Sequence, residues 1–256
     1  MRDQKIALIT GGSRRIGAQI CRTLHALGHQ IIIHYAKSQA AAQALAKELN
    51  ALRAGSAKTI CLDFADIDDL VKLNRFQSQT LALFGRLDVL IHNASSFYPT
   101  DLTCDTTTIS SHYHELFLTN SKAPLILSHL FLKELTANAG QIISLLDIHA
   151  DNKPFVNYPI YTMAKSSHRA MVQALALELA PVVRVNGVSP GVNVLPDDFS
   201  DAMCNTLRQS VPLKKIGTPT DISQAVAFLL DASYITGQII AVDGGRSLTL
   251  CGGQYS

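Results

Sequence analysis

The sequence predicts an α/β fold: a single doubly wound domain with a mostly parallel seven-stranded sheet covered by helices on both faces. Short apolar runs alternate with longer helical stretches along the 256-residue chain. Most of these runs are nearly continuously apolar, which is typical of strands buried on both faces of a parallel sheet. A glycine-rich turn follows the first run, and no linker interrupts the alternation. We therefore expect one domain over 1–256.

The elements follow in order from these patterns. The expected strands are the apolar runs 5–10, 30–35, 57–62, 87–92, 141–146, 183–189 and 238–243. The expected helices are 15–27, 38–53, 67–84, 109–135, 159–180 and 219–231. Pro159 suits a first helical turn, where its missing N–H is not needed, and Thr220 with Asp221 after Pro219 is a helix-start signal. The stretch 192–218 is the least periodic, and we expect a mobile substrate flap there.

Composition excludes several classes of protein. The chain is 47% hydrophobic and 16% charged, so it can bury a core and is not a disordered protein. Its net charge of +2 gives little attraction to nucleic acid or anionic membranes. The first apolar run is too short to span a bilayer. Five scattered cysteines form no metal-binding spacing, which favours reduced thiols in a cytoplasmic protein without a metal site.

The turn ITGGSRRIG (9–17) predicts a phosphate site. Glycines such as Gly11 let the backbone approach a pyrophosphate, and the following helix N-terminus, beginning near Ile16, supplies N–H donors. Arg15 stands where a third glycine is expected. We expect Arg14 and Arg15 beside cofactor phosphates or an anionic substrate edge; the alternative is two surface arginines at a helix start.

The end of the second expected strand favours NADPH over NADH. An acidic residue roughly 20 residues past the glycines usually holds the ribose 2′-hydroxyl of NAD. This chain has no acidic residue between Asp3 and Glu48. The segment HYAKS instead offers Lys37 and Ser38, a cation and a hydroxyl that suit a 2′-phosphate. The alternative is that Lys37 is merely solvated.

Tyr161 and Lys165 are the expected catalytic pair. They lie four residues apart on an expected helix and therefore share a face. A free tyrosine has a pKa of about 10, and a nearby ammonium favours the phenolate and lowers that value. Such a pair can relay a proton to a substrate that receives hydride, and Lys165 can also reach the ribose hydroxyls. Tyr158 lacks this partner, because Thr162 stands four residues after it.

Taken together, the motifs resemble those of the short-chain dehydrogenase/reductase family, which has a Rossmann fold. The resemblance covers essentially the whole chain and is carried by the glycine-rich turn, HNA (92–94), Asn120, YxxxK, RVNGVSPG (184–191) and ITGQIIAVDGG (235–245). It implies that Asn93 backs the cofactor, that Asn120 joins the proton relay through water, and that Asp63 contacts the adenine. The implied cofactor-binding set is completed by Ile16, His34, Tyr35, Phe64, Ala94, Ser95, Pro190 and Gly191.

Departures from the family pattern narrow the substrate. The family usually has a serine after the fifth strand, where it polarises a carbonyl oxygen; here Asp147 takes that position. Together with Arg15, HYAKS, NASSFYPT, YTMAK and VLPDDF, this resembles pteridine reductases and bacterial dihydromonapterin reductases. A pterin presents ring nitrogens that must be protonated as hydride reaches the adjacent carbon. A carboxyl and tyrosine pair can do this if burial raises the pKa of Asp147.

The same resemblance implies the substrate contacts. Phe97 would stack on the pterin ring opposite the nicotinamide, and Ser95 and Arg15 would bond its polar edge. Val194 and Leu195, in the flap, would face its side chain. Each has an alternative, because Asp147 can simply cap a turn, Phe97 can be core, and Ser95 can bond its own loop. His149 is a rival acid, although its loop position favours a surface histidine; Asp197 and Asp198 either close the flap or are solvated.

We therefore expect a cytoplasmic, NADPH-dependent reductase of a 7,8-dihydropterin, with dihydrofolate as a secondary substrate and a place in tetrahydrofolate metabolism. The resemblance also implies a homotetramer in which the helices of 109–135 and 159–180 pack against their copies. One alternative is a carbonyl or 3-oxoacyl thioester reductase, although an ionised Asp147 would repel a developing alkoxide. Another is a non-catalytic NADP(H) sensor, which need not keep Tyr161 and Lys165.

Overall fold

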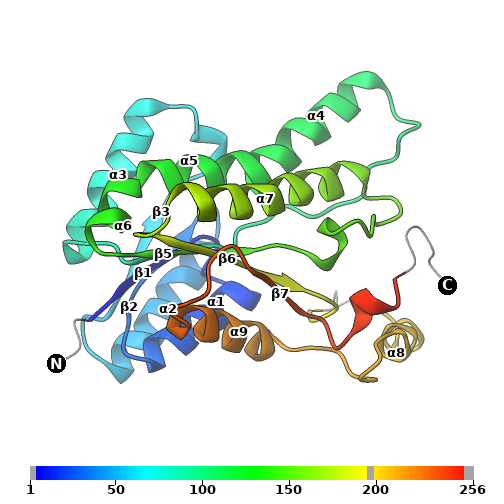
Figure 1. Ribbon diagram of the computed structural model, residues 1–256. Helices are drawn as coiled ribbons and strands as arrows, with labels where there is room; N and C mark the ends of the chain where they lie inside the picture. The colour runs from blue at the N-terminus through cyan, green and yellow to red at the C-terminus, as the bar shows by residue number, and fades with distance from the viewer. Residues whose placement is uncertain (1–3, 195–198, 251–256) are drawn as a thin grey trace.

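The computed structural model describes residues 4–194 and 199–250, and within them a seven-stranded sheet lies between two layers of helices (Figure 1). The strand order is β3-β2-β1-β4-β5-β6-β7, and every pair is parallel, where the sequence predicted a mostly parallel sheet. The strands are β1 (Ile6–Ile9), β2 (Gln30–Tyr35), β3 (Ala57–Cys61), β4 (Val89–His92), β5 (Gln141–Leu145), β6 (Arg184–Pro190) and β7 (Ile239–Val242). The order reverses between β1 and β4, where such sheets open a ligand crevice.

Helices cover both faces of the sheet (Figure 1). One layer holds α1 (Arg15–Ala26), α2 (Gln39–Leu52) and α9 (Pro219–Asp231). The other layer holds α3 (Leu70–Phe84), α5 (Ala123–Leu130), α6 (Leu132–Ala137) and α7 (Pro159–Glu178), with α4 (Thr106–Phe117) packed on α7. Strand side chains alternate between the two cores: Ala7 and Ile9 face the first layer, and Ile6 and Leu8 face the second. Among the described residues, no helix combines the length and hydropathy that a bilayer crossing requires.

The predicted strands and most predicted helices are confirmed, but the continuous helix expected over 109–135 is wrong. A π-helical turn, Leu118–Lys122, separates α4 from α5 and carries the buried Asn120. A π turn inserts a single residue into the helical ladder, so the apolar spacing along the chain hardly changes. Pro124 does not break the helix, because it lies in the first turn of α5.

Helix α8 (Asp201–Ser210) lies inside the stretch that the sequence predicted as an irregular flap. Its N-terminus is capped by the Ser200 side chain, which accepts a hydrogen bond from the backbone N–H of Met203. None of its side chains is buried. Its large apolar residues are only Met203 and Leu207, four residues apart, and a pattern this short does not by itself predict a helix.

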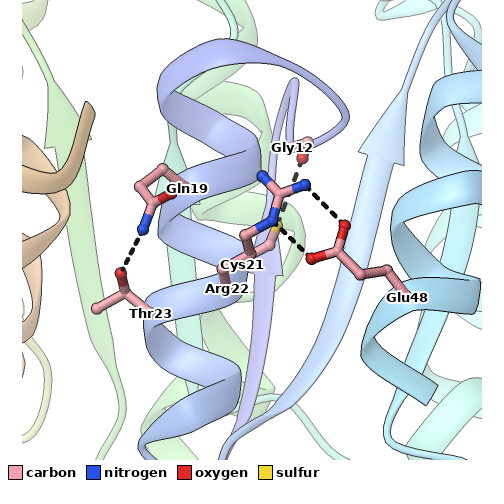
Figure 2. Close-up of polar contacts among 6 residues, drawn as sticks. All are labelled: Gly12, Gln19, Cys21, Arg22, Thr23 and Glu48. Atoms are coloured by element: carbon pink, nitrogen blue, oxygen red, sulfur yellow. Dashed lines mark hydrogen bonds and ion pairs between the residues drawn. The ribbon is translucent and has the colours of Figure 1, made fainter. Parts of the chain in front are cut away.

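Helix α1 is fixed to the turn before it and to α2 (Figure 2). The buried Cys21 thiol donates to the backbone carbonyl of Gly12 over 3.5 Å, and burial raises its pKa, so the thiol stays protonated. Arg22 makes two 2.8 Å hydrogen bonds to the Glu48 carboxylate on α2. These contacts hold α1 against the turn after β1 and against α2.

Gly17 leaves no room for a side chain at this helix start. A Cβ there would lie 2.4 Å from the backbone oxygen of Gly11 and 2.5 Å from the Asn93 side-chain nitrogen. We expect Gly17→Ala to reduce the free energy of unfolding by about 1–3 kcal/mol, because the turn must move to admit the methyl group. Urea unfolding followed by circular dichroism measures this.

The matched control is Gly217→Ala, the same substitution at a glycine where the nearest atom to a new Cβ is 3.4 Å away. Its unfolding midpoint should stay close to that of the wild type. Equal stability losses in the two variants would contradict a steric role for Gly17.

Candidate active site

A cavity of about 610 Å³ opens at the carboxyl ends of the strands, where the strand order reverses. The ends of β2 and β3 and the turn after β1 bound one side, and the segments after β4, β5 and β6 bound the other. Its predicted lining residues are Gly11, Arg14, Arg15, Ile16, His34, Lys37, Asp63, Phe64, Asn93, Ala94, Ser95, Phe97, Asp147, Tyr161, Lys165, Pro190, Gly191 and Val194. The structure thus gathers nearly all the predicted site residues around one cavity.

The turn after β1 has the backbone of a phosphate-binding loop. Gly11 has φ +59°, and Arg15, at the position where the sequence expectation was glycine, has φ +50°. A side chain in this left-handed region is uncommon, so Arg15 adopts a conformation that glycine would adopt more easily. The guanidinium of Arg15 then donates across the cavity mouth to the carbonyl oxygen of Val194, 3.3 Å away. Leu195, the other predicted flap contact, lies outside the described residues, as do Asp197 and Asp198.

His34 stabilises this turn through a hydrogen bond to its backbone. Its Nδ1 accepts from the backbone N–H of Gly11 at 3.2 Å, so its Nε2 carries the proton and donates to the Leu62 carbonyl at 2.9 Å. Burial lowers its pKa to about 4, which keeps the imidazole neutral in this arrangement. The Phe64 ring stacks on it at 5.1 Å. His34 therefore fixes the turn, besides lining the cavity.

Lys37, the cation that the sequence predicted, lies at the β2 and β3 end of the cavity. Lys37 and Arg14 line it, and so does Asp63, whose Oδ1 accepts from the backbone N–H of Ala65 at 3.0 Å. Tyr35 and Ser38 are not among the residues that line the cavity. Strand alternation turns Tyr35 toward the core beneath α1 and α2 instead.

Asn93 and Thr10 join the ends of β1 and β4. The Asn93 side-chain amide donates to the carbonyls of Thr10 and Gly11, at 2.9 and 3.0 Å. In return, the Thr10 hydroxyl accepts from the backbone N–H groups of Asn93 and Ala94, at 2.9 and 3.1 Å. The glycine-rich turn and the segment leading to Phe97 are thereby held in one register.

Asn120 lies behind the cavity wall and does not line it. Its amide nitrogen donates to the Ser96 carbonyl at 2.9 Å, and its amide oxygen accepts from the Ser95 hydroxyl at 2.6 Å. The first bond fixes the amide orientation, so Ser95 is the donor in the second. The side chain of Asn120 is thus engaged with the loop after β4, through Ser95, which lines the cavity.

The carboxylate of Asp147 meets the hydroxyl of Tyr161. The Tyr161 Oη donates to Asp147 Oδ2 over 2.8 Å, and Asp147 Oδ1 accepts from the backbone N–H of His149, also at 2.8 Å. One Asp147 oxygen therefore caps the turn after β5, and the other accepts a hydrogen bond from Tyr161. His149 is not the surface histidine that its loop position favoured, because only 9% of it is exposed.

The electrostatics of Tyr161 differ from the sequence expectation. Burial, and next the charge of Asp147, raise the pKa of Tyr161 well above its ordinary value, whereas the sequence predicted a value lowered by Lys165. Lys165 Nζ lies 6.0 Å from the Tyr161 ring centre and donates to the Leu145 carbonyl at 2.9 Å. Burial lowers the pKa of Lys165 to about 8, and the charge of Asp147 opposes this shift. In this arrangement the phenol keeps its proton.

Two buried histidines lie behind this pair. His168, one turn beyond Lys165 on α7, contacts the Ser144 hydroxyl at 3.0 Å, and His92, at the end of β4, contacts the Ser128 hydroxyl at 2.9 Å. Burial lowers the pKa of both, that of His92 to about 3. They are neutral and add no positive charge beneath Lys165.

Phe97 is a wall of the cavity and not a core residue. It lines the cavity with 54% of its surface exposed, and its ring stands edge-on to Tyr161 at 4.8 Å. The ring of Tyr158 stacks on it at 4.6 Å with an angle of 5° between the planes. Tyr158 was not predicted as a site residue, because aromatic stacking depends on the loop conformation.

Further lining residues were missed, and most had a signal in their position. They directly follow strand ends or flank predicted site residues, and they are Gly17, Ala36, Ser96, Leu145, Leu146, Val192 and Asn193. Thr119 also lines the cavity. It comes from the π turn, which the apolar pattern does not show.

Comparison with known proteins agrees with this geometry. The family model described as enoyl-(acyl carrier protein) reductase matches residues 11–247. The chain is 37% identical to pteridine reductase 1 of Leishmania tarentolae, over 95% of this chain and 96% of that protein. It is 31% identical to a 3-oxoacyl-(acyl-carrier-protein) reductase of Staphylococcus aureus, over 96% and 99% of the two chains. It is 29% identical to tropinone reductase-like 3 of Erythroxylum coca, over 95% and 93%.

These relatives are reductases that share the whole length of the chain, and the match includes the glycine-rich turn and the Tyr161–Lys165 helix. The protein is therefore an oxidoreductase, and the chain belongs to the short-chain dehydrogenase/reductase family.

Proposed function

We propose that the protein reduces a 7,8-dihydropterin to the tetrahydropterin with NADPH, with dihydrofolate as a secondary substrate. The observation that carries this proposal is the 2.8 Å hydrogen bond from Tyr161 to Asp147 at the wall of the cavity. A carbonyl reductase needs a neutral donor toward the substrate oxygen at this position. A carboxylate there suits a substrate whose ring nitrogen takes up a proton.

The β2 and β3 end of the cavity fits NADPH. Gly11 has the positive φ that lets its backbone approach a pyrophosphate, and the N-terminus of α1 points its free N–H groups to the same place. Arg14 and Lys37 line this end and can neutralise a 2′-phosphate. The cofactor supplies the hydride when bound. The chain's own residues bind and orient the cofactor, and they donate the proton to the substrate.

Tyr161 and Asp147 would supply the proton that the substrate nitrogen takes up. Because its pKa is raised, the phenol is protonated at neutral pH and can donate from Oη. As a substrate nitrogen takes that proton, the phenolate that forms is stabilised by the Lys165 ammonium on the same helix face. Asp147, once it has taken up a proton from solvent, can pass that proton to the Tyr161 phenolate along the bond they already share. Asn120 supports this relay as a positioning residue, through its bond to Ser95.

The other wall fits a flat aromatic substrate. Phe97 offers an exposed ring at the cavity, standing edge-on to Tyr161. A planar ring lying on Phe97 would therefore have its edge near the Tyr161 hydroxyl. Pteridine reductase 1 of Leishmania tarentolae, at 37% identity, supports the pterin assignment.

We also propose a cytoplasmic homotetramer. Large apolar side chains are exposed on α4 and α7, among them Tyr113 (47%), Met163 (53%) and Leu177 (83%). Packing these helices against copies of themselves would cover such side chains. The four cysteines within the described part of the chain are free thiols, in agreement with a reducing compartment.

The test of the activity is NADPH oxidation in parallel with dihydrobiopterin, dihydromonapterin, dihydrofolate and an acetoacetyl thioester. We expect turnover of the dihydropterins and a much lower rate with NADH. Turnover of the thioester alone would show a 3-oxoacyl reductase. Tight NADPH binding without turnover of any substrate would show a cofactor sensor.

Asp147→Ser tests the Tyr161–Asp147 pair independently of the rest of the site. We expect kcat for a dihydropterin to fall about 10²- to 10⁴-fold, the usual contribution of a general acid–base group. The Kd for NADPH, measured by fluorescence titration, should stay the same, because the phosphate turn is untouched. Asp151→Ser is the control, since Asp151 pairs with Arg169 and does not line the cavity. Undiminished pterin turnover in Asp147→Ser would remove Asp147 from the mechanism.

The lowered pKa of Lys165 predicts the pH dependence. Its ammonium is present below its pKa of about 8 and is lost as the pH rises through that value. Single-turnover NADPH oxidation should therefore decline above about pH 8. In Asp147→Asn the residual rate should decline at a lower pH, because the carboxylate that raises the pKa of Lys165 is gone. A profile that stays flat to about pH 10, the ordinary range of lysine, would contradict this role.

A further inference from the structure

We propose that Tyr158, which does not line the cavity, is a positioning residue that holds Phe97 as a rigid stacking wall for the planar substrate. The inference rests on the proposed function, because it takes Phe97 as the substrate's stacking surface. It concerns how that surface is kept in place. Tyr158 also stands edge-on to Tyr161, at 6.4 Å, but its nearer and more parallel contact is with Phe97, through which we propose that it acts without touching the substrate.

Four aromatic rings form a continuous series from the turn after Asp147 to the cavity wall. We call His149, Phe155, Tyr158 and Phe97 the ring column. Successive rings are stacked, with centre-to-centre distances of 4.4 Å from His149 to Phe155, 4.4 Å from Phe155 to Tyr158, and 4.6 Å from Tyr158 to Phe97. The last pair is the most nearly parallel, at 5° between planes, against 24° and 21° for the other two.

The base of the ring column is fixed to the catalytic turn. The backbone N–H of His149 donates to Asp147 Oδ1, and the His149 Nδ1 lies 2.8 Å from the Lys153 carbonyl. Tyr158 is the residue immediately before α7, and its carbonyl accepts from the backbone N–H of Thr162 at 2.9 Å. These bonds join the column to the turn that carries Asp147 and to the helix that carries Tyr161.

Of the rings around Phe97, Tyr158 stacks nearest, at 4.6 Å; Phe155 also stacks with Phe97, at 6.1 Å, and Tyr161 meets it edge-on, at 4.8 Å. Phe97 lies in the segment after β4 that has no regular secondary structure, and 54% of its surface is exposed. One backbone hydrogen bond ties this loop to the column: the N–H of Thr100 donates to the carbonyl of Asn157, next to Tyr158, at 2.8 Å. An exposed ring on an irregular segment loses rotamer freedom when a ligand stacks on it, and this weakens binding. Tyr158 covers one face of Phe97 and removes that freedom before the substrate arrives.

The geometry also directs the substrate. With Tyr158 on one face of Phe97, a planar ligand is left with the opposite face. The edge-on contact of Phe97 with Tyr161, at 4.8 Å, then sets how far the ligand edge lies from the hydroxyl. Because the column and the Tyr161–Asp147 pair share the turn at His149, the stacking surface and the acid are parts of one rigid unit.

The test compares Tyr158→Leu with Tyr158→Phe, which keeps the ring and loses only the hydroxyl. We expect Tyr158→Leu to raise the KM for a dihydropterin roughly 2- to 12-fold, the equivalent of one aromatic stacking contact. Its kcat and its Kd for NADPH should stay within about 2-fold of the wild type. Tyr158→Phe should restore the wild-type KM. The control is Tyr234→Leu, the same change at a fully exposed tyrosine (104%), which should leave the KM unchanged.

A double-mutant cycle with Phe97→Leu separates positioning from direct contact. If Tyr158 acts through Phe97, Tyr158→Leu adds no further increase in KM once Phe97 is leucine. An additive increase would overturn the proposal, since it would mean that Tyr158 touches the substrate itself. A fall in kcat without a change in KM would also overturn it.

A second measurement does not depend on turnover. In protein with 13C-labelled phenylalanine, the Phe97 ring should be ordered in the wild type and in Tyr158→Phe, and mobile on the ps–ns timescale in Tyr158→Leu. If the wild type takes no dihydropterin, the proposed function fails, and this measurement still decides whether Tyr158 holds Phe97. An equally ordered ring in all three proteins would overturn the inference.

Discussion

The site depends on the hydrogen bonds between Thr10 and Asn93, where the strand order reverses. The chain leaves β1 and β4 toward opposite faces of the sheet, which opens a crevice there, and the strand ladder itself does not fix the loops that follow. The four hydrogen bonds between Thr10–Gly11 and Asn93–Ala94 do so. On one side they set the turn that begins at Gly11, and on the other the segment that leads to Phe97. The glycine-rich turn and the Phe97 wall of the cavity are thus placed relative to each other by a single bonded unit.

Much of this arrangement could be predicted from the sequence, because it depends on local patterns. The apolar runs place the strands, and the strand ends place Gly11, Lys37, Asn93 and Asp147 at one edge of a parallel sheet. What the patterns could not show depends on backbone detail. The π turn that buries Asn120 changes the apolar spacing by too little to be seen, and the stacking of Tyr158 on Phe97 needs the conformation of two loops.

The protonation states of Tyr161 and Lys165 could not be predicted for a different reason. Spacing on a helix shows that Tyr161 and Lys165 share a face, but it does not show which partner each finds. Lys165 donates to the Leu145 carbonyl, and Tyr161 donates to Asp147. Burial acts on both side chains, and it shifts their pKa values in opposite directions because it disfavours the anion of tyrosine and the cation of lysine. The neutral His34, His92 and His168 follow the same rule. The protonation states of the groups around the site are therefore set mainly by desolvation.

The bond from Ser95 to Asn120 has a consequence for selectivity. A hydroxyl has one proton, and Ser95 gives it to an amide oxygen that cannot change roles, because the other end of that amide is held by Ser96. A ligand that turns a carbonyl toward Ser95 would therefore set two acceptors against each other, at the cost of an unsatisfied polar contact. A ligand that turns an amino group there completes the hydrogen bond. A molecule bound at this point of the wall would therefore be selected by the polarity of one edge, besides its size and flatness.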